Sequence, residues 1–242
     1  MKLVVLGSSS SGNCYVLDAG NEALILEAGI RLNEVKKVLG FNIRKVVGCL
    51  ITHQHGDHAK YIKGMIDLGI PTLALPEVWT AKDVWGSRSV AIQPGRGYKL
   101  GNFRVLPFTA FHDVPCVGYM INHPQCGNIM FLTDSYVCEY KFRNLNHVMI
   151  ECNYADSALY KAISEGRTLP SQRDRLLTSH MELETCKEYL KSSDLSQVHN
   201  IVLLHLSKDN GDELLFVSEI EKATGKVVYA GKRGLTVDLD LM

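Results

Sequence analysis

Three histidines and one aspartate lie within the six-residue run His53-Gln54-His55-Gly56-Asp57-His58. Neutral imidazole and carboxylate are ligands that suit zinc, manganese and iron. His53 and His55 alternate on extended backbone and can face one ion, whereas Asp57 and His58 begin a helix and can face a second. Because so short a loop cannot easily direct all four side chains at one tetrahedral ion, the spacing predicts two metal ions. The alternative is a solvated histidine-rich turn.

The residues around this run predict the elements that position it. The apolar segment 46–51 reads as a buried strand before the run, and 57–68 has helical spacing after it. Metal ligands commonly stand where a rigid element ends and a short turn aims side chains at one point. The context therefore favours a metal site over a solvated turn.

Further candidate ligands follow apolar β runs later in the chain. His112 comes after the predicted strand 103–108 and can complete a three-histidine set with His53 and His55. Asp134 ends the predicted strand 129–132. It reads either as a carboxylate that bridges two ions or as the N-cap of a helix.

Two more histidines belong to the same pattern. His205 follows the predicted strand 201–204 and can join Asp57, His58 and Asp134 in a second ligand set. His180 precedes the predicted helix 182–191, where it either caps that helix or serves as an acid over the metals. The remaining three histidines are predicted to be ordinary surface residues: His123, His147 and His199.

Candidate substrate contacts lie in two other segments. The Gly/Ser-rich turn 7–13 reads as a hairpin loop. Alternatively, its backbone N–H groups and hydroxyls, with Ser9 and Ser10 as candidates, line the mouth of the site and touch a substrate phosphate. The segment after the predicted helix 157–164 reads as a loop carrying Arg167, Arg173 and Arg175, which bind neighbouring phosphates or form a solvated loop.

The composition is that of an ordinary globular protein. The 242 residues are 46% hydrophobic and 21% charged, with a formal net charge of zero and a pI near 7.1. Such a balance argues against a strongly basic nucleic-acid coat and favours short or small substrates. No linker, charge block or low-complexity tract divides the chain, so residues 1–242 are expected to form one domain.

The cysteines and the N-terminus indicate a cytoplasmic protein. The seven cysteines are scattered, odd in number and without a CxxC pair, which predicts reduced and mostly buried thiols. The apolar run 3–6 is too short for a signal-peptide core, and no run elsewhere is long enough to span a bilayer. No membrane association is therefore expected.

The order of elements predicts an α+β fold. Strands come first, then strands and helices alternate, and the second half repeats this order. The polar residues singled out above all lie at strand ends, where sites in α/β proteins usually form. We therefore expect two β-rich halves with helices outside. The predicted helices are 31–39, 57–68, 76–84, 157–164, 182–191 and 213–224.

The ligand series resembles that of the metallo-β-lactamase superfamily, and the resemblance spans nearly the whole chain. It implies a four-layer αββα sandwich of two mixed sheets with helices on the outer faces and a dinuclear site at the strand ends. The residues that match the superfamily's metal ligands, in chain order, are His53, His55, Asp57, His58, His112, Asp134 and His205.

Narrower features resemble the YycJ/WalJ-type branch of that superfamily. They are the turn 7–14, the segment 151–153, His180 and the run 204–207. This branch implies phosphodiesterase or exonuclease activity. His180 precedes His205 by 25 residues, similar to the placement of a catalytic histidine in ribonuclease Z and in a cyclic-phosphate phosphodiesterase. That similarity implies a general acid or a phosphate contact.

Some residues differ from the family's usual pattern, and some segments found in related enzymes are absent. Glu27 stands where the family usually has an Asp behind the metal ligands, and its extra methylene bears on their orientation. The segment 181–184 reads Met-Glu-Leu-Glu rather than the Leu-Ser-Asn-Glu usual in the branch. The chain lacks the large insertion of ribonuclease J-type enzymes after Asp134 and the tRNA-gripping arm of ribonuclease Z.

The leading hypothesis is a dinuclear metal-dependent phosphodiesterase or nuclease. A metal-bridging hydroxide would attack phosphorus, His180 would protonate the leaving oxygen, and Asp57 would act in catalysis as well as in metal binding. The ligands suit zinc, manganese or iron, and the substrate is DNA, RNA or a small cyclic phosphodiester. One alternative is a thioester or lactone hydrolase on the same scaffold. Another is a non-catalytic phosphate-binding domain.

Overall fold

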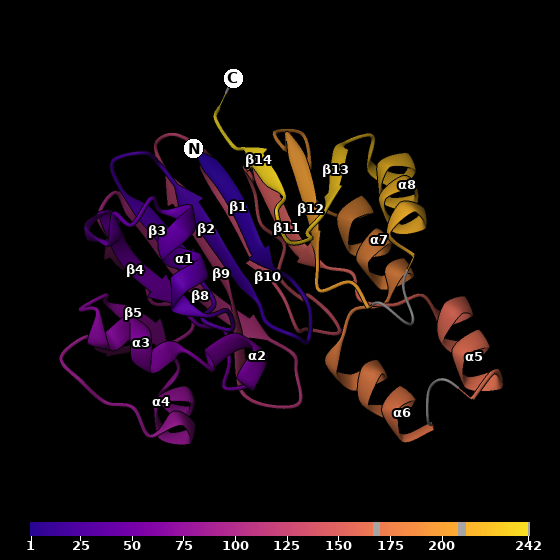
Figure 1. Ribbon diagram of the computed structural model, residues 1–242. Helices are drawn as coiled ribbons and strands as arrows, with labels where there is room; N and C mark the ends of the chain where they lie inside the picture. The colour runs from indigo at the N-terminus through magenta and orange to yellow at the C-terminus, as the bar shows by residue number, and fades with distance from the viewer. Residues whose placement is uncertain (167–169, 208–211, 242) are drawn as a thin grey trace.

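Two seven-stranded β-sheets stack face to face, with helices on their outer faces (Figure 1). The computed structural model describes residues 1–166, 170–207 and 212–241. The predicted αββα sandwich is confirmed. The first sheet has the order β14-β1-β2-β3-β4-β5-β6, with bounds β1 Lys2–Gly7, β2 Cys14–Asp18, β3 Ala23–Leu26, β4 Val46–Leu50, β5 Thr72–Ala74, β6 Ser89–Ala91 and β14 Thr236–Asp238. The second has the order β13-β12-β11-β10-β9-β8-β7, with bounds β7 Tyr98–Leu100, β8 Phe103–Ala110, β9 Cys116–His123, β10 Gly127–Leu132, β11 His147–Glu151, β12 Asn200–Leu204 and β13 Val227–Ala230.

Five of the described helices lie in two outer layers. In Figure 1, α1, α3 and α4 lie on the side of the first sheet, and α7 and α8 on the side of the second. α5 and α6 lie together at one end of the sandwich. The helices and the single 3₁₀ turn are α1 Leu32–Val38, η1 Ile43–Lys45, α2 Gly56–Ala59, α3 Ile62–Asp67, α4 Pro76–Lys82, α5 Asp156–Ser164, α6 Pro170–Ser179, α7 Leu183–Lys191 and α8 Glu213–Thr224.

Side-chain alternation along the central strands explains the layers. On β10, Ile129 and Phe131 join the core between the two sheets, whereas Met130 and Leu132 join a second core under α7 and α8. Both faces are thus buried, which is why this strand reads as a continuous apolar run. The ring of Phe131 meets that of Tyr15 edge-on, with centroids 5.5 Å apart, and so couples the sheets.

Parallel pairing places the functional strand ends together. β3 to β6 run parallel in the first sheet, and β10 to β13 run parallel in the second. The carboxyl ends of these strands therefore lie along one edge of each sheet, and their following residues face a shared space.

The single helix predicted over 57–68 is wrong, because the chain forms two short helices, α2 and α3. In a continuous helix the carbonyls of Asp57 and His58 would accept from residues 61 and 62. Here Asn13 N–H donates to Asp57 O at 2.8 Å and Ala28 N–H donates to His58 O at 2.7 Å. Tyr61 N–H donates instead to Ala28 O at 2.9 Å. Contacts between distant segments thus interrupt the helix.

The loop predicted to carry three arginines is also wrong where the structure describes it. Arg173 and Arg175 lie on α6, which begins at Pro170. Proline suits the first turn of a helix, but the polar composition of this segment hides its period. Arg167 lies outside the described residues.

Two of the three histidines predicted at the surface are buried. His147 is bonded through both ring nitrogens, to Asn200 Oδ1 and to Leu239 O, each at 3.0 Å. His123 contacts Glu22 Oε1 at 3.1 Å and accepts from Gln125 N–H at 3.2 Å. The prediction failed because the polar partners of both histidines come from distant parts of the chain.

The predicted state of the cysteines is confirmed. All seven cysteines are free, and six of them are buried. Across the described ranges, the helices are all too short or too polar to cross a lipid bilayer.

Candidate metal centre

Three imidazoles converge beyond the ends of β4 and β8. His53 Nε2 lies 3.1 Å from His55 Nδ1, and His112 Nε2 lies 3.2 Å from that same atom. His53 is fully buried, and the His112 side chain is 1% exposed. The structure thus brings together the three histidines that the sequence predicts as one ligand set.

Asp134 stands at the centre of a second group. Its Oδ2 lies 3.3 Å from His58 Nε2 and 3.8 Å from both His53 Nε2 and His112 Nε2. Its Oδ1 lies 3.0 Å from His205 Nδ1. Among the described residues, Asp134 is therefore the carboxylate that contacts histidines from both sides of the cluster. The helix N-cap alternative does not apply, because the described chain has no helix at this residue.

Glu151, the last residue of β11, also enters the cluster, although the sequence analysis assigned it no role in the site. Its Oε1 lies 2.7 Å from His180 Nδ1 and 3.1 Å from His205 Nδ1, and its Oε2 accepts from Ser135 N–H. In the sequence, Glu151 has the same feature as Asp134, namely a carboxylate at the end of an apolar strand. Together, Asp134, Glu151, His180 and His205 form a set whose possible ligand atoms lie within 4.8 Å of one another.

Asp57 lies at the margin of these groups. Its Oδ2 is 3.3 Å from His58 Nε2 and 3.8 Å from His205 Nε2, and it accepts from Asn13 Nδ2 at 3.2 Å. The structure therefore places Asp57 beside the cluster, within reach of the two histidines with which it was predicted to act.

Glu27 lies behind His58, fully buried. Its Oε1 is 3.5 Å from His58 Nδ1 and 3.3 Å from the backbone N–H of Thr52. His58 Nδ1 is buried and makes no hydrogen bond. The longer glutamate thus fills the position predicted for it and faces the outer nitrogen of a candidate ligand.

Three of the six described non-glycine residues with positive φ angles lie at this cluster. Glu27, Asp134 and His205 have φ angles of 66°, 50° and 53°, in the left-handed region. Such angles cost about 1–3 kcal/mol for residues other than glycine and cluster at functional sites. Glu27 and His205 directly follow β3 and β12. The sharp change of backbone direction aims each side chain from its strand end toward the shared space.

The donor set fits divalent metal ions. Nitrogen ligands about 2.0–2.1 Å from a tetrahedral zinc ion lie about 3.3 Å apart, close to the separations among His53, His55 and His112. A neutral imidazole has only one N–H group, so ring nitrogens that face one another form few hydrogen bonds. These contacts alone therefore stabilise the protein little. Burial, with the neighbouring His58, holds the pKa of His53 well below its usual range, so this imidazole is neutral and able to bind a metal.

The charged members of the cluster have strongly shifted pKa values. Burial opposes ionisation of Asp134, but the adjacent His205 and His58 more than offset it and hold its pKa well below the usual range. Burial likewise opposes the charge on His205, while Asp134 and Glu151 raise its pKa to about 10. The group therefore concentrates carboxylate charge in a space closed to solvent, where a cation is stabilised.

A model of the metallo-β-lactamase superfamily matches residues 9–123, which include the run 53–58 and His112. The chain is therefore similar to the metallo-β-lactamase superfamily over this part of its length. This similarity and the histidine–carboxylate cluster together support a divalent-metal site of a hydrolase.

Two known proteins are similar to most of the chain. Over 226 residues it is 25% identical to the exodeoxyribonuclease WalJ of Streptococcus pneumoniae, covering 86% of this chain and 82% of that protein. Over 224 residues it is 25% identical to the exodeoxyribonuclease YycJ of Bacillus anthracis, covering 85% and 82%. The crystal structure of the metallo-β-lactamase fold protein YhfI of Bacillus subtilis is similar with a TM-score of 0.74, at 16% identity over 98% of this chain and 99% of that one.

The predicted substrate contacts differ in their distance from the metal centre. Ser9 and Ser10 line a hollow of about 200 Å³ together with His180 and His205. Arg175 pairs with Asp113 at 3.2 Å, and Asp113 in turn lies 3.1 Å from His112 Nε2. Arg173 instead lies over the ring of Tyr160 and pairs with Asp174.

Proposed function

We propose that this chain is a dinuclear metal-dependent phosphodiesterase that hydrolyses nucleic acid. One observation carries the proposal: His180, bonded to Glu151, lies beside the metal cluster and lines the hollow that also holds Ser9 and Ser10. The names of the two exodeoxyribonuclease relatives support DNA as the substrate. The reduced, buried cysteines are consistent with the cytoplasmic location predicted above.

We assign the ligands in two sets joined by Asp134. His53, His55 and His112 would hold one ion, as their mutual distances support. The second ion would be held by Asp57, His58 and His205, and Asp134 would bridge the two. Zinc and manganese both suit imidazole with carboxylate, and iron is a third choice. Because both sheets contribute ligands, we infer that residues 1–242 act as one domain.

The residues around this centre have distinct tasks. When bound, the divalent ions supply Lewis acidity and lower the pKa of water toward about 7. Glu151 fixes the ring of His180 through Nδ1, which leaves Nε2 for proton transfer to the leaving oxygen. Burial lowers the pKa of His180, but the Glu151 carboxylate more than offsets this and raises it above the ordinary value. The raised pKa favours the protonated imidazole, which is the form that an acid requires.

The test compares substrates and one variant. Metal-loaded protein is assayed on single-stranded DNA, duplex DNA, RNA, a 2′,3′-cyclic nucleotide, bis(p-nitrophenyl) phosphate, a thioester and a lactone. We expect the phosphodiesters to be cleaved. The His180→Ala variant should lose about 10²–10⁴-fold in turnover while keeping its metal, and the His199→Ala control should match the parent protein.

Two results would overturn these assignments. Faster turnover of the thioester or lactone than of any phosphodiester would refute the phosphodiesterase proposal. Loss of metal by the His180→Ala variant in elemental analysis would make His180 a ligand rather than the general acid.

A further inference from the structure

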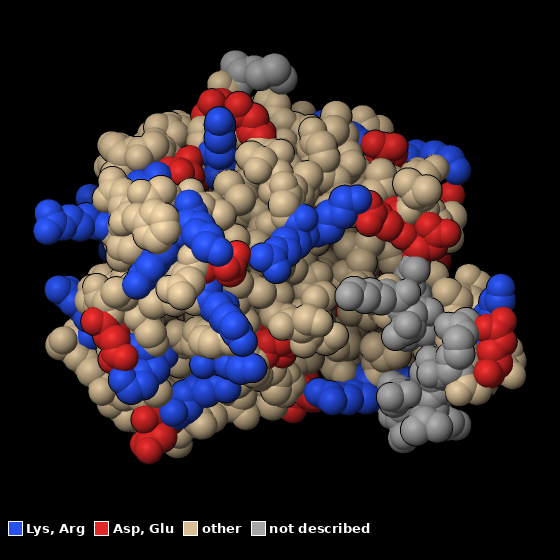
Figure 2. Space-filling model, viewed as in Figure 1, with Lys and Arg blue, Asp and Glu red and all other residues tan. Residues whose placement is uncertain are grey.

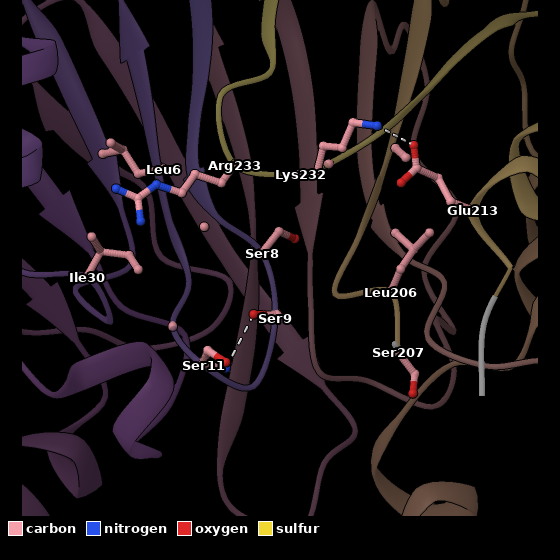
Figure 3. Close-up of a pocket in the computed structure, with 14 residues that line it drawn as sticks. Leu6, Ser8, Ser9, Ser11, Ile30, Leu206, Ser207, Glu213, Lys232 and Arg233 are labelled. Carbon is pink, nitrogen blue, oxygen red and sulfur yellow. Dashed lines mark hydrogen bonds and ion pairs between the residues drawn. The ribbon is translucent and has the colours of Figure 1, made fainter. Parts of the chain in front are cut away.

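A second hollow, of about 630 Å³, adjoins the metal centre. It lies between the β1–β2 loop, the residues after β12 and the turn between β13 and β14 (Figure 3). This volume lies within the range of about 300–1,000 Å³ that small-molecule sites occupy. Its lining combines serine hydroxyls, an apolar wall and two cations, which the metal cluster does not use.

The two hollows share part of their lining. Ser9, Ser11, Leu206 and Ser207 line both the second hollow and the smaller one that contains His180 and His205. Ser8, at the base of the same loop, accepts a hydrogen bond from His205 N–H at 2.8 Å. A ligand that extends from the metal centre past this serine loop therefore enters the second hollow.

Two cations stand at the rim of the second hollow. Figure 3 shows Lys232 reaching toward Glu213 on one side and Arg233 reaching toward Leu6 and Ile30 on the other. Lys232 pairs with Glu213 at 2.7 Å and Arg233 with Glu34 at 3.1 Å, and these cations are 68% and 69% exposed. Figure 2 shows Lys and Arg side chains across the middle of this face.

These ion pairs are weak and can be exchanged. Exposed pairs contribute about 0–1 kcal/mol, whereas phosphate forms charge-assisted hydrogen bonds with both kinds of side chain. Leu6, Ile30 and Leu206 offer an apolar surface between the cations and the serine loop. Anionic groups on an apolar body, joined in a chain, are the chemistry of a polynucleotide strand.

The serine loop is held rigidly. A side chain at Gly12 would come within 2.7 Å of Gly29 O, and its φ of +147° disfavours other residues. Gly12 N–H donates to Ser9 O at 2.8 Å, and Ser11 N–H donates to Ser9 Oγ at 3.3 Å. The hydroxyls between the two hollows therefore have a fixed place along the path.

We infer that the second hollow binds the nucleotide next to the scissile phosphate of a single-stranded polynucleotide, with Lys232 and Arg233 on its flanking phosphates. The inference rests on the proposed function, because it takes the metal centre as the place of cleavage. It adds a strand-binding subsite and two residues that set affinity for polymeric substrates.

The experiment measures binding and turnover separately. The metal-loaded protein is titrated with a fluorescein-labelled phosphorothioate oligothymidylate, which keeps its charges and resists cleavage, over a range of salt concentrations. The test variant is Lys232→Ala/Arg233→Ala. The control is Lys63→Ala/Lys222→Ala, which removes two lysines that are 70% and 69% exposed and also ion-paired. A parallel titration with an oligouridylate compares RNA with DNA.

We expect the test variant to bind at least about tenfold more weakly at low salt. Its plot of log affinity against log salt should be flatter by about 1.4, since each phosphate contact on a single strand contributes about 0.7. Its turnover of bis(p-nitrophenyl) phosphate, which has no flanking phosphates, should equal that of the parent. The control should keep the parent's affinity and slope.

Equal affinity and slope in the test and control variants would overturn the inference, even if the parent cleaves DNA. Loss of bis(p-nitrophenyl) phosphate turnover by the test variant, with normal thermal unfolding, would also count against it, since the effect would then lie at the metal centre. Failure of the parent protein to cleave any phosphodiester would refute the proposed function, while the salt slopes would still test the second hollow.

Discussion

Histidines are buried at both of the opposite edges of the second sheet, but the partners of their ring nitrogens differ. At the edge where β9 ends and β11 begins, His123 and His147 have protein partners for both ring nitrogens. At the edge where β10, β11 and β12 end, imidazoles and carboxylates crowd together, and His58 Nδ1 makes no hydrogen bond.

The difference separates structural histidines from ligand histidines. A buried polar group normally has a hydrogen-bond partner, because an unpaired one costs about 1–3 kcal/mol. The first edge obeys this rule within the protein. At the second edge, ring nitrogens such as His53 Nε2 and His55 Nδ1 face one another 3.1 Å apart, as ligands of one ion would, so convergence of donor atoms, rather than burial, marks the candidate metal ligands.

The largest expected effect comes from removing the central carboxylate of the metal edge. Asp134→Asn should lose at least one ion and at least about 100-fold in turnover, because even partners outside the ligand shell affect metal sites by 10–100-fold. Elemental analysis and phosphodiesterase assays measure both. The His147→Leu variant, at the opposite edge, should keep its metal. Full metal content in the Asp134→Asn variant would refute the bridging role.

A smaller effect is expected from the carboxylate behind His58. Glu27→Gln keeps the shape of the side chain but removes the charge that faces His58 Nδ1. We expect metal affinity, measured by chelator competition, to fall about tenfold. The matched control is Glu22→Gln, which changes the carboxylate that contacts His123 at the other edge. Equal affinities in both variants would show that Glu27 does not support the metal.

The structural edge should respond through stability instead. His147→Leu removes a buried imidazole whose two ring nitrogens contact Asn200 Oδ1 and Leu239 O, which should lower the free energy of unfolding by about 2–4 kcal/mol. Urea denaturation at neutral pH measures the change. The half-buried neighbour gives the control, since His199→Leu should alter stability by less than about 0.5 kcal/mol. Loss of metal by the His147→Leu variant would contradict the assignment of His147 to a purely structural role.

The smallest expected effect is a pH dependence at His147. Burial lowers the pKa of His147 below its ordinary value of 6.5. As pH falls below about 6.5, the unfolded chain therefore binds a proton that the folded chain does not, and stability falls by up to about 1.4 kcal/mol per pH unit. The stability gap between parent and His147→Leu should narrow from pH 7 to pH 5 in urea titrations. A constant gap would contradict the pKa shift.

Residue type and strand-end position made most of the cluster readable in the sequence. His53, His55, His112 and Asp134 each follow an apolar run that forms a strand, and parallel strands end along one edge. Glu151 meets the same criterion. It was not singled out, because a lone glutamate after a strand is common and only His180 and His205, brought from afar, give it a role.

The alternation of apolar residues and the ligand spacing, which are local properties, were sufficient to predict two β-rich halves with outer helices and the candidate ligands, whereas the family resemblance implied the four-layer sandwich. Tertiary structure alone decided what depends on distant partners. It decided the break between α2 and α3, where the N–H groups of Asn13 and Ala28 donate to carbonyls that a continuous helix would use. It also decided the left-handed backbone conformation at Glu27 and His205. It also decided which histidines are satisfied by the protein. Hydrogen-bond partners far along the chain leave no trace in local periodicity, so only the folded molecule separates His147 from His58.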